Sequence, residues 1–226
     1  MVSLGLVILG LSGCKDVTTE GYTGITYYPT IEIKGDPVIY LPTGADYNDA
    51  GADAIENGEP TDVAVSSNLD TSTPGSYSIS YTATNADGFS ATAKRSVIVY
   101  DANMSTTDIS GTYSAHVIRD NDPDKEYSGN PVTLTPSSIP GTTGIYETSD
   151  WIGGFYDKGY DYGAAYAFTG LIQINGDNEV LELSMSNPWG DPFTSVSGNY
   201  DAVSGVISYT AVWSAGPYEF VVDLAK

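Results

Sequence analysis

Basic residues, histidine and cysteine are scarce in this chain of 226 residues. It contains 8 Lys and Arg against 29 Asp and Glu, together with one histidine and one cysteine, and its formal net charge is −21. Affinity for nucleic acid or for an anionic membrane surface comes from clustered Lys and Arg, so we expect neither partner. A single cysteine excludes an intrachain disulfide and a four-ligand Cys/His zinc site. A cysteine or serine hydrolase would depend on Cys14 or His116, and neither lies in a supporting motif.

Residues that favour strands and turns are abundant instead. The chain has 25 Gly, 12 Pro and 18 Tyr, and its 41% hydrophobic content is sufficient for folded cores. No segment combines a 3.6-residue apolar period with helix caps. The composition therefore predicts an all-β protein with many turns.

The N-terminal segment resembles a bacterial lipoprotein signal. Val2–Gly13 is an uncharged apolar run that is too short for a comfortable bilayer span, and it ends in Leu11-Ser12-Gly13-Cys14. This ending resembles the lipobox, which implies cleavage after a signal peptide of residues 1–13 and a lipid anchor on Cys14. No Lys or Arg precedes the run, which departs from the pattern and fits a translation start upstream. The alternative is a buried N-terminal strand whose cysteine has no special role.

Residues 14–34 are expected to form the lipidated cysteine and a polar tether. Lys15-Asp16 and Glu20 resemble the short charged export signal of Bacteroidetes surface lipoproteins. The resemblance implies an outer-membrane protein exposed at the cell surface, with the inner face of that membrane as the alternative.

Residues 35–101 contain short alternating runs separated by turns. In Tyr77–Thr84 the residues Tyr77, Ile79, Tyr81 and Ala83 share one face, as in a half-buried antiparallel strand. This pattern predicts a β-sandwich.

The sequence of this segment also resembles a known repeat. Three strings carry the resemblance, namely Tyr47–Ala54, Leu69–Tyr77 and Tyr81–Thr92. They resemble the Ig-like repeat of bacterial surface proteins, which implies a spacer or interaction module without catalysis. Nine acids and no Lys or Arg lie between Gly35 and Ala93, and we interpret them as a solvated acidic surface, with a calcium site as the alternative.

Residues 108–226 are expected to form a second antiparallel β domain, a sandwich or barrel-like sheet of roughly eight strands. Tyr113, Ala115 and Val117 alternate onto one face of its first strand. The ending from Val196 to Phe220 resembles the C-terminal domain of small Bacteroidetes lipoproteins, some of which accompany SusC/SusD-type nutrient importers. That resemblance implies two protein partners, a TonB-dependent importer channel and its lipoprotein lid.

All three tryptophans lie in this second domain. Trp213 lies inside a predicted strand and is expected in the core. Two Gly-rich and Asp-rich segments, Trp151–Gly163 and Asn187–Phe193, are expected to be loops whose aromatic rings contact a glycan, a peptide or a partner protein. The candidate contact residues are Trp151, Phe155, Tyr156, Tyr160, Tyr162 and Trp189. The alternative is that these rings cap the sheet.

No metal site or cofactor is expected. Asp120–Glu126 has oxygens at alternate positions but lacks the turning glycine and the closing Glu of a calcium loop, so an acidic hairpin is favoured over a calcium site. The sequence as a whole predicts a non-catalytic surface lipoprotein, an accessory importer subunit that binds ligand or partner proteins. The alternatives are a structural stalk or adhesin subunit, and a glycosidase that uses a pair of carboxylates.

Overall fold

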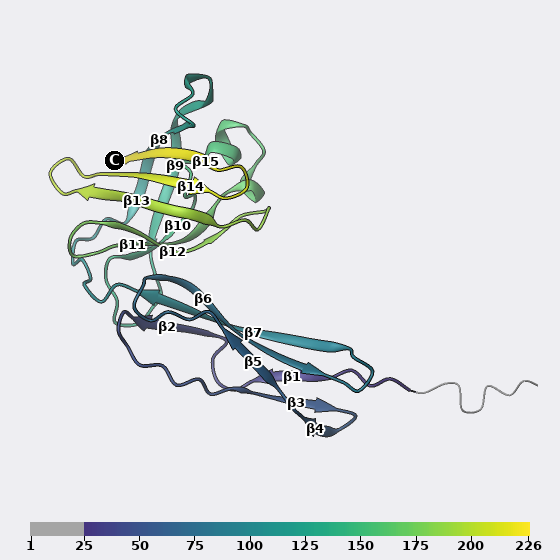
Figure 1. Cartoon of the computed structure of the whole chain (residues 1–226). Helices are drawn as coiled ribbons and strands as arrows, with labels where there is room; N and C mark the ends of the chain where they lie inside the picture. Colours follow the sequence, from purple (N-terminus) through teal and green to yellow (C-terminus); the bar gives the residue numbers. More distant parts are fainter. Residues whose placement is uncertain (1–24) are drawn as a thin grey trace, which may run out of the picture.

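The computed structural model describes residues 25–226, which form two β domains one after the other along the chain (Figure 1). The predicted signal peptide and Cys14 lie outside the described residues. Within residues 25–226 no helix is both long enough and apolar enough to cross a membrane. The all-β fold class predicted from the sequence is confirmed.

The N-terminal domain is an Ig-like pair of sheets. Its strands are β1 (Thr30–Ile33), β2 (Val38–Pro42), β3 (Ala52–Glu56), β4 (Glu59–Thr61), β5 (Ala64–Ser67), β6 (Gly75–Thr84) and β7 (Ser90–Tyr100). One sheet has the order β1-β3-β4 and the other the order β2-β7-β6-β5, in which β2 runs parallel to β7. Strand β1 lies in the segment for which the sequence predicts a tether, and it belongs to this domain.

The core of this domain lies between the two sheets and follows the predicted alternation. Ile79 and Tyr81 of β6 are buried against Val97 and Val99 of β7. Ser78 and Ser80, which alternate with these residues on β6, point to the other side, so the strand presents one apolar face to the core.

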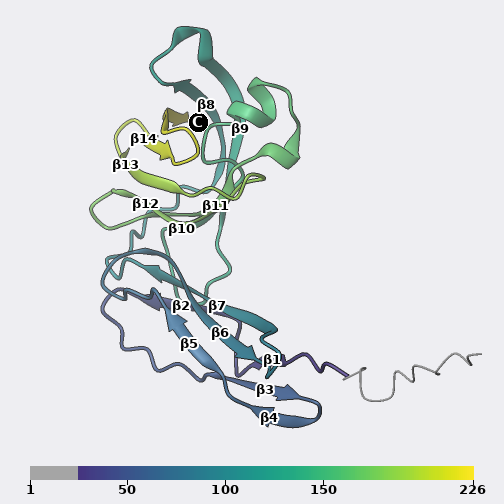
Figure 2. The same cartoon turned by 45° about the vertical axis from the view of Figure 1, so that its right-hand side comes forward.

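The C-terminal domain is a single sheet that curls into a nearly closed barrel (Figure 2). Its strands are β8 (Gly111–Arg119), β9 (Glu126–Pro136), β10 (Ile145–Thr148), β11 (Thr169–Ile174), β12 (Val180–Ser186), β13 (Phe193–Asp201), β14 (Val206–Trp213) and β15 (Tyr218–Ala225). The order is β12-β11-β10-β9-β8-β15-β14-β13, with every neighbouring pair antiparallel. The end strands meet at one hydrogen bond, 2.8 Å from Tyr200 N to Asn178 O, and one isolated bridge between Glu179 and Asn199.

The barrel interior holds the residues that the alternation assigns to it. Tyr113, Ala115 and Val117 of β8 are buried, and so is Trp213, as expected from its place in a strand. Helical structure in residues 25–226 is limited to three short turns, η1 (Pro123–Lys125), the π-turn η2 (Phe155–Gly159) and η3 (Ala164–Tyr166). Two of these lie between β10 and β11.

The two domains are joined by specific contacts at the start of the linker. The side chain of Gln173 on β11 accepts a hydrogen bond from Asp101 N and donates one to Asp101 O, each at 2.8 Å. Next to this pair, Ile98 of β7 packs with Ile145 and Leu183 of the barrel. Apolar packing and paired backbone groups therefore fix the orientation of the barrel on the Ig-like domain.

Candidate functional site

The segment between β10 and β11 closes one end of the barrel. It turns inward at Gly153 and Gly154, whose φ angles of 65° and 73° are in the left-handed region that glycine adopts without strain. A Cβ on Gly153 would lie 3.0 Å from the Cβ of Val117, so the backbone approaches the barrel wall closely. The π-turn η2 follows, and the segment appears as the green coil beside the barrel in Figure 1.

This closure buries three of the predicted contact residues. Trp151 and Phe155 are 0% exposed and Tyr156 is 8% exposed, so their rings are part of the core and the prediction of exposed loop aromatics is wrong for them. Trp151 Nε1 donates a hydrogen bond to Ser184 O at 3.2 Å, which satisfies its polar atom. The physical reason is that a small barrel must fill its open end, and large rings do so at the greatest gain in buried area.

The other three predicted residues lie on the outside of this closure. Tyr160, Tyr162 and Trp189 are 37%, 52% and 43% exposed, and Tyr166 joins them at 36%. Neighbouring ring centroids are 5.5 Å apart for Tyr160 and Tyr162, 5.2 Å for Tyr162 and Tyr166, and 5.5 Å for Tyr166 and Trp189. These four residues form a continuous surface, which we call the aromatic ridge.

Sequence reasoning missed Tyr166. It follows Tyr162 by four residues in the same Gly-rich stretch, and this spacing of two tyrosines is the signal that could have indicated it. The short turn η3 places its ring between those of Tyr162 and Trp189.

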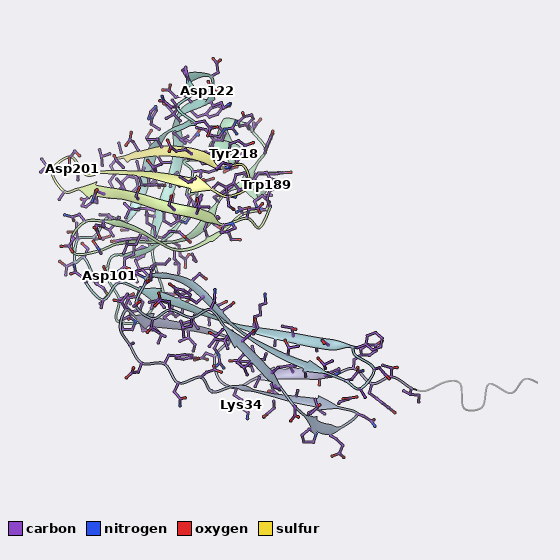
Figure 3. The ribbon with its side chains drawn as sticks, viewed as in Figure 1. Lys34, Asp101, Asp122, Trp189, Asp201 and Tyr218 are labelled. Carbon is purple, nitrogen blue, oxygen red and sulfur yellow. The ribbon has the colours of Figure 1, made fainter. Side chains whose placement is uncertain are left out.

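Trp189 is held by a tight turn. Asn187 Oδ1 accepts hydrogen bonds from Trp189 N and Gly190 N, both at 2.9 Å, while its amide donates to Asp191 O at 2.7 Å. The indole packs on Trp213 with ring centroids 5.3 Å apart. Figure 3 shows Trp189 and Tyr218 at the same end of the barrel, with Asp201 at the opposite end. The exposed indole is therefore preorganised by the turn and by the core beneath it.

Arg119 supports the ridge from below. Its guanidinium lies 5.1 Å from the ring centroid of Phe155 and 4.7 Å from that of Tyr218, and its Nη1 donates a hydrogen bond to the Tyr156 hydroxyl at 3.1 Å. Burial raises the pKa of the Tyr156 hydroxyl, although the hydrogen bond from Arg119 opposes this shift. Tyr156 therefore stays a neutral hydroxyl that links the half-buried guanidinium of Arg119 to the rings above it.

Two carboxyl groups are enclosed in the closure. Asp150 is 3% exposed and Asp157 is 8% exposed. Burial raises the pKa of the Asp150 carboxyl to about 7, against a hydrogen bond from Ile152 N to its Oδ1 at 2.8 Å. Asp157 forms an ion pair of 3.0 Å with Lys158. Both carboxyl groups are turned into the protein, and one oxygen of each, Asp150 Oδ2 and Asp157 Oδ1, is buried without a hydrogen-bond partner among the described residues.

The acidic segment Asp120–Glu126 is the hairpin between β8 and β9. Asp122 caps η1 and forms an ion pair of 2.9 Å with Lys125, while Asp120 Oδ1 accepts a hydrogen bond from Glu219 N at 3.0 Å. These carboxylates are engaged within the hairpin and with β15. Across the part of the chain that the structure describes, no group of three or more His, Cys, Asp or Glu residues is arranged to hold a metal ion.

His116 lies on the outer face of β8 between two carboxylates. Its Nε2 is 2.9 Å from Glu126 Oε1 and its Nδ1 is 3.7 Å from Asp223 Oδ2. The side chain is 42% exposed, so His116 is a surface residue in contact with these two carboxylates.

Comparisons with known proteins assign both domains. Residues 101–226 match the family model of a C-terminal domain. This match covers more than half of the chain. The chain belongs to that family. Residues 31–99 match the Ig-like domain of bacterial surface proteins, as the strings from Tyr47 onward indicate.

Among solved structures, this family member is similar to the lipoprotein BT2262 from Bacteroides thetaiotaomicron. The two are 29% identical, the match covers 88% of this chain and 100% of the other, and the TM-score is 0.46. A comparison with curated proteins gives no match.

Proposed function

We propose that this protein is a non-catalytic lipoprotein of the outer-membrane surface, an accessory subunit of a SusC/SusD-type nutrient importer. Its ligand is a glycan or a peptide, and its protein partners are the TonB-dependent channel and the lipoprotein lid. The lipobox at Cys14 and the Ig-like domain of bacterial surface proteins support the location. In Figure 1 strand β1, the first strand of the Ig-like domain, lies on the side of that domain away from the barrel, as expected of a spacer.

The aromatic ridge is the observation that carries the binding role. The four half-exposed rings form one contiguous aromatic surface, and exposed apolar patches mark interaction sites. Rings that rest on a packed core lose little conformational freedom on binding. Flat aromatic faces suit the C–H faces of sugar rings and the side chains of a peptide.

Two ridge variants test direct ligand binding. Trp189→Ala and Tyr162→Ala should each weaken binding to glycan or peptide arrays by about tenfold, because each removes one ring from the contact surface. Phe89→Ala is the matched control, since Phe89 is an exposed aromatic of the Ig-like domain, 47% exposed. Equal binding by all three variants and the wild type would overturn a ligand role for the ridge.

The importer role has its own test. The lipidated protein is purified through a tag from gently solubilised outer membranes, and the co-purifying proteins are identified by mass spectrometry. Recovery of a TonB-dependent channel and its lid in equal amounts supports the proposal. Recovery of the protein alone contradicts it, and assembly of the purified protein into polymers would favour the stalk or adhesin alternative.

A further inference from the structure

A second surface feature lies between the two domains, away from the aromatic ridge. It is a groove of about 510 Å³, with Tyr40 of the Ig-like domain on one side and the outer face of β9, β10 and β11 on the other. We call it the interdomain groove. Its volume is within the range of small-molecule sites, which often form where two domains meet.

The barrel wall of this groove is built by strand register. Thr135 of β9, Glu147 of β10 and Leu171 of β11 are direct partners across the three strands, so their side chains form one row. Thr135 and Glu147 are exposed and Leu171 is half-buried, which places the row on the outer face of the barrel. Thr169, the first residue of β11, lies two residues before Leu171 and continues this face toward the start of the strand.

The opposite wall is an exposed ring on an edge strand. Tyr40 of β2 is 41% exposed and is the register partner of Ile98 on β7. Ile98 is buried in the apolar cluster that joins the domains, so Tyr40 stands at the margin of that junction with its side chain on the same face. The junction contacts of Gln173 and Asp101 hold the two walls apart at a fixed spacing.

The polar side chains of the groove carry hydroxyl groups and a single carboxylate. Its lining has four threonines, one serine and one carboxylate, and it has no Lys or Arg. Within the described residues, no protein hydrogen bond is made by the side chains of Thr135, Glu147 and Thr169 or by the hydroxyl of Tyr40, so these groups are free for a ligand. An anion would meet a carboxylate and no cation there.

The barrel wall of the groove presents side chains to a ligand, and its backbone groups are already paired. Strands β9, β10 and β11 are each hydrogen-bonded to a neighbour on both sides, so a peptide gains no strand pairing from them. The ligand that fits is uncharged, rich in hydroxyl groups, and has an apolar face for one aromatic ring. A pyranose has these properties, because its C–H groups carry slight positive charge toward the negative face of a ring.

We propose that the interdomain groove binds a neutral saccharide. The ring of Tyr40 stacks on one sugar face, and the side chains of Glu147, Thr135 and Thr169 bind its hydroxyl groups. This site is independent of the aromatic ridge and does not rest on the importer role. A protein with both sites would hold one glycan chain at two points or two separate chains.

The test is a titration of the two-domain protein, residues 25–226, monitored by the NMR signals of its threonine methyl groups and tyrosine rings. The probes are the neutral sugars glucose, galactose, mannose and xylose and their disaccharides, at up to millimolar concentrations. We expect at least one of them to shift the signals of Thr135, Thr169 and Tyr40 in a saturable way. Tyr40→Ala should weaken this binding about tenfold, and Glu147→Gln should weaken it while keeping the shape of the wall.

Val38→Ala is the matched control for Tyr40→Ala. Val38 lies two residues earlier on β2, on the same face and 42% exposed, but it does not line the groove. Its variant should bind as the wild type does. The proposal is overturned if no probe shifts groove signals, if shifts occur only at Tyr160, Tyr162 and Trp189, or if Tyr40→Ala binds no more weakly than Val38→Ala.

Discussion

Arg95 forms an ion pair with Asp49 inside the Ig-like domain, although the two residues lie on different segments of the chain. The Arg95 side chain is only 1% exposed, and it also donates hydrogen bonds to the hydroxyls of Tyr47 and Tyr81, at 3.2 and 2.9 Å. Its remaining nitrogens bond to the backbone oxygens of Lys34 and Asp36. Tyr47 and Asp49 open one of the strings that identify the Ig-like repeat, so this part of the motif encloses a buried cation.

Removal of Asp49 should therefore destabilise the domain strongly. Asp49→Ala leaves the guanidinium of Arg95 buried without its counter-charge, and we expect the free energy of unfolding to fall by about 3–5 kcal/mol. Urea denaturation measures the change. Lys94→Ala, at the neighbouring exposed position on β7, should change the free energy by less than about 0.5 kcal/mol. Similar losses in both variants would show that the pair has no special role.

Asp150 predicts a stability that falls as the pH rises. Burial raises the pKa of Asp150 to about 7 in the folded protein, whereas the ordinary value is 3.8. Between these two values the unfolded chain binds fewer protons than the folded one, so the free energy of unfolding decreases from pH 4 to pH 7, by up to about 4 kcal/mol. Burial also raises the pKa of Glu182, which acts in the same direction.

Asp150→Asn should remove most of this pH dependence. Its unfolding curves at pH 5 and pH 8 should lie closer together than those of the wild type, with the remaining difference due to Glu182. Tyr209 packs near Asp150 but stays neutral throughout this window, because burial raises its pKa well above 10. If the free energy of unfolding depends on pH as strongly in Asp150→Asn as in the wild type, the Asp150 carboxyl has its ordinary pKa in the folded protein.

Gly153 should not tolerate a side chain. Gly153→Ala combines a positive φ with a Cβ only 3.0 Å from Val117, and we expect a loss of about 2–4 kcal/mol with partial opening of the barrel end. Gly205→Ala is the matched control, because Gly205 has a φ of 75° and open space around its Cβ position. It should cost about 1 kcal/mol. Thermal unfolding and the near-ultraviolet signal of Trp151 report the two effects.

Gln173 should control the rigidity of the domain junction. Gln173→Leu leaves both backbone groups of Asp101 without their partners, and we expect a loss of about 1–3 kcal/mol and a wider range of domain orientations. Small-angle X-ray scattering and residual dipolar couplings measure that range. A variant whose couplings still fit one orientation would show that the apolar contact of Ile98 and Leu183 is sufficient by itself.

Local patterns in the sequence were sufficient for the strands. Tyr77–Ala83 and Tyr113–Val117 alternate with a period of two, and a strand with one buried face requires only that local rule. The turn chemistry and the Ig-like strings placed these strands in the right kind of domain.

The closure of the barrel could not be predicted in the same way. Whether Trp151 and Phe155 point inward depends on the interior that eight strands create by long-range pairing, and no neighbour in the sequence carries that information. Arg95 was missed for a similar reason, since its partner lies 46 residues away. Trp213 could be assigned to the core because its strand alone determines its direction.

Strand β1 has a mechanical consequence for a protein held from its N-terminal side. It is the first strand of the Ig-like domain and pairs with β3 through four residues, from Thr30 to Ile33. Figure 3 shows Asp101 at the junction of the two domains, and Figure 1 shows β1 toward the other end of the Ig-like domain. A pull between these two ends runs along β1, and its hydrogen bonds to β3 lie across that direction. The four residue pairs then share the load and must break together. The pairing of β1 with β3 therefore resists a force that acts on the barrel.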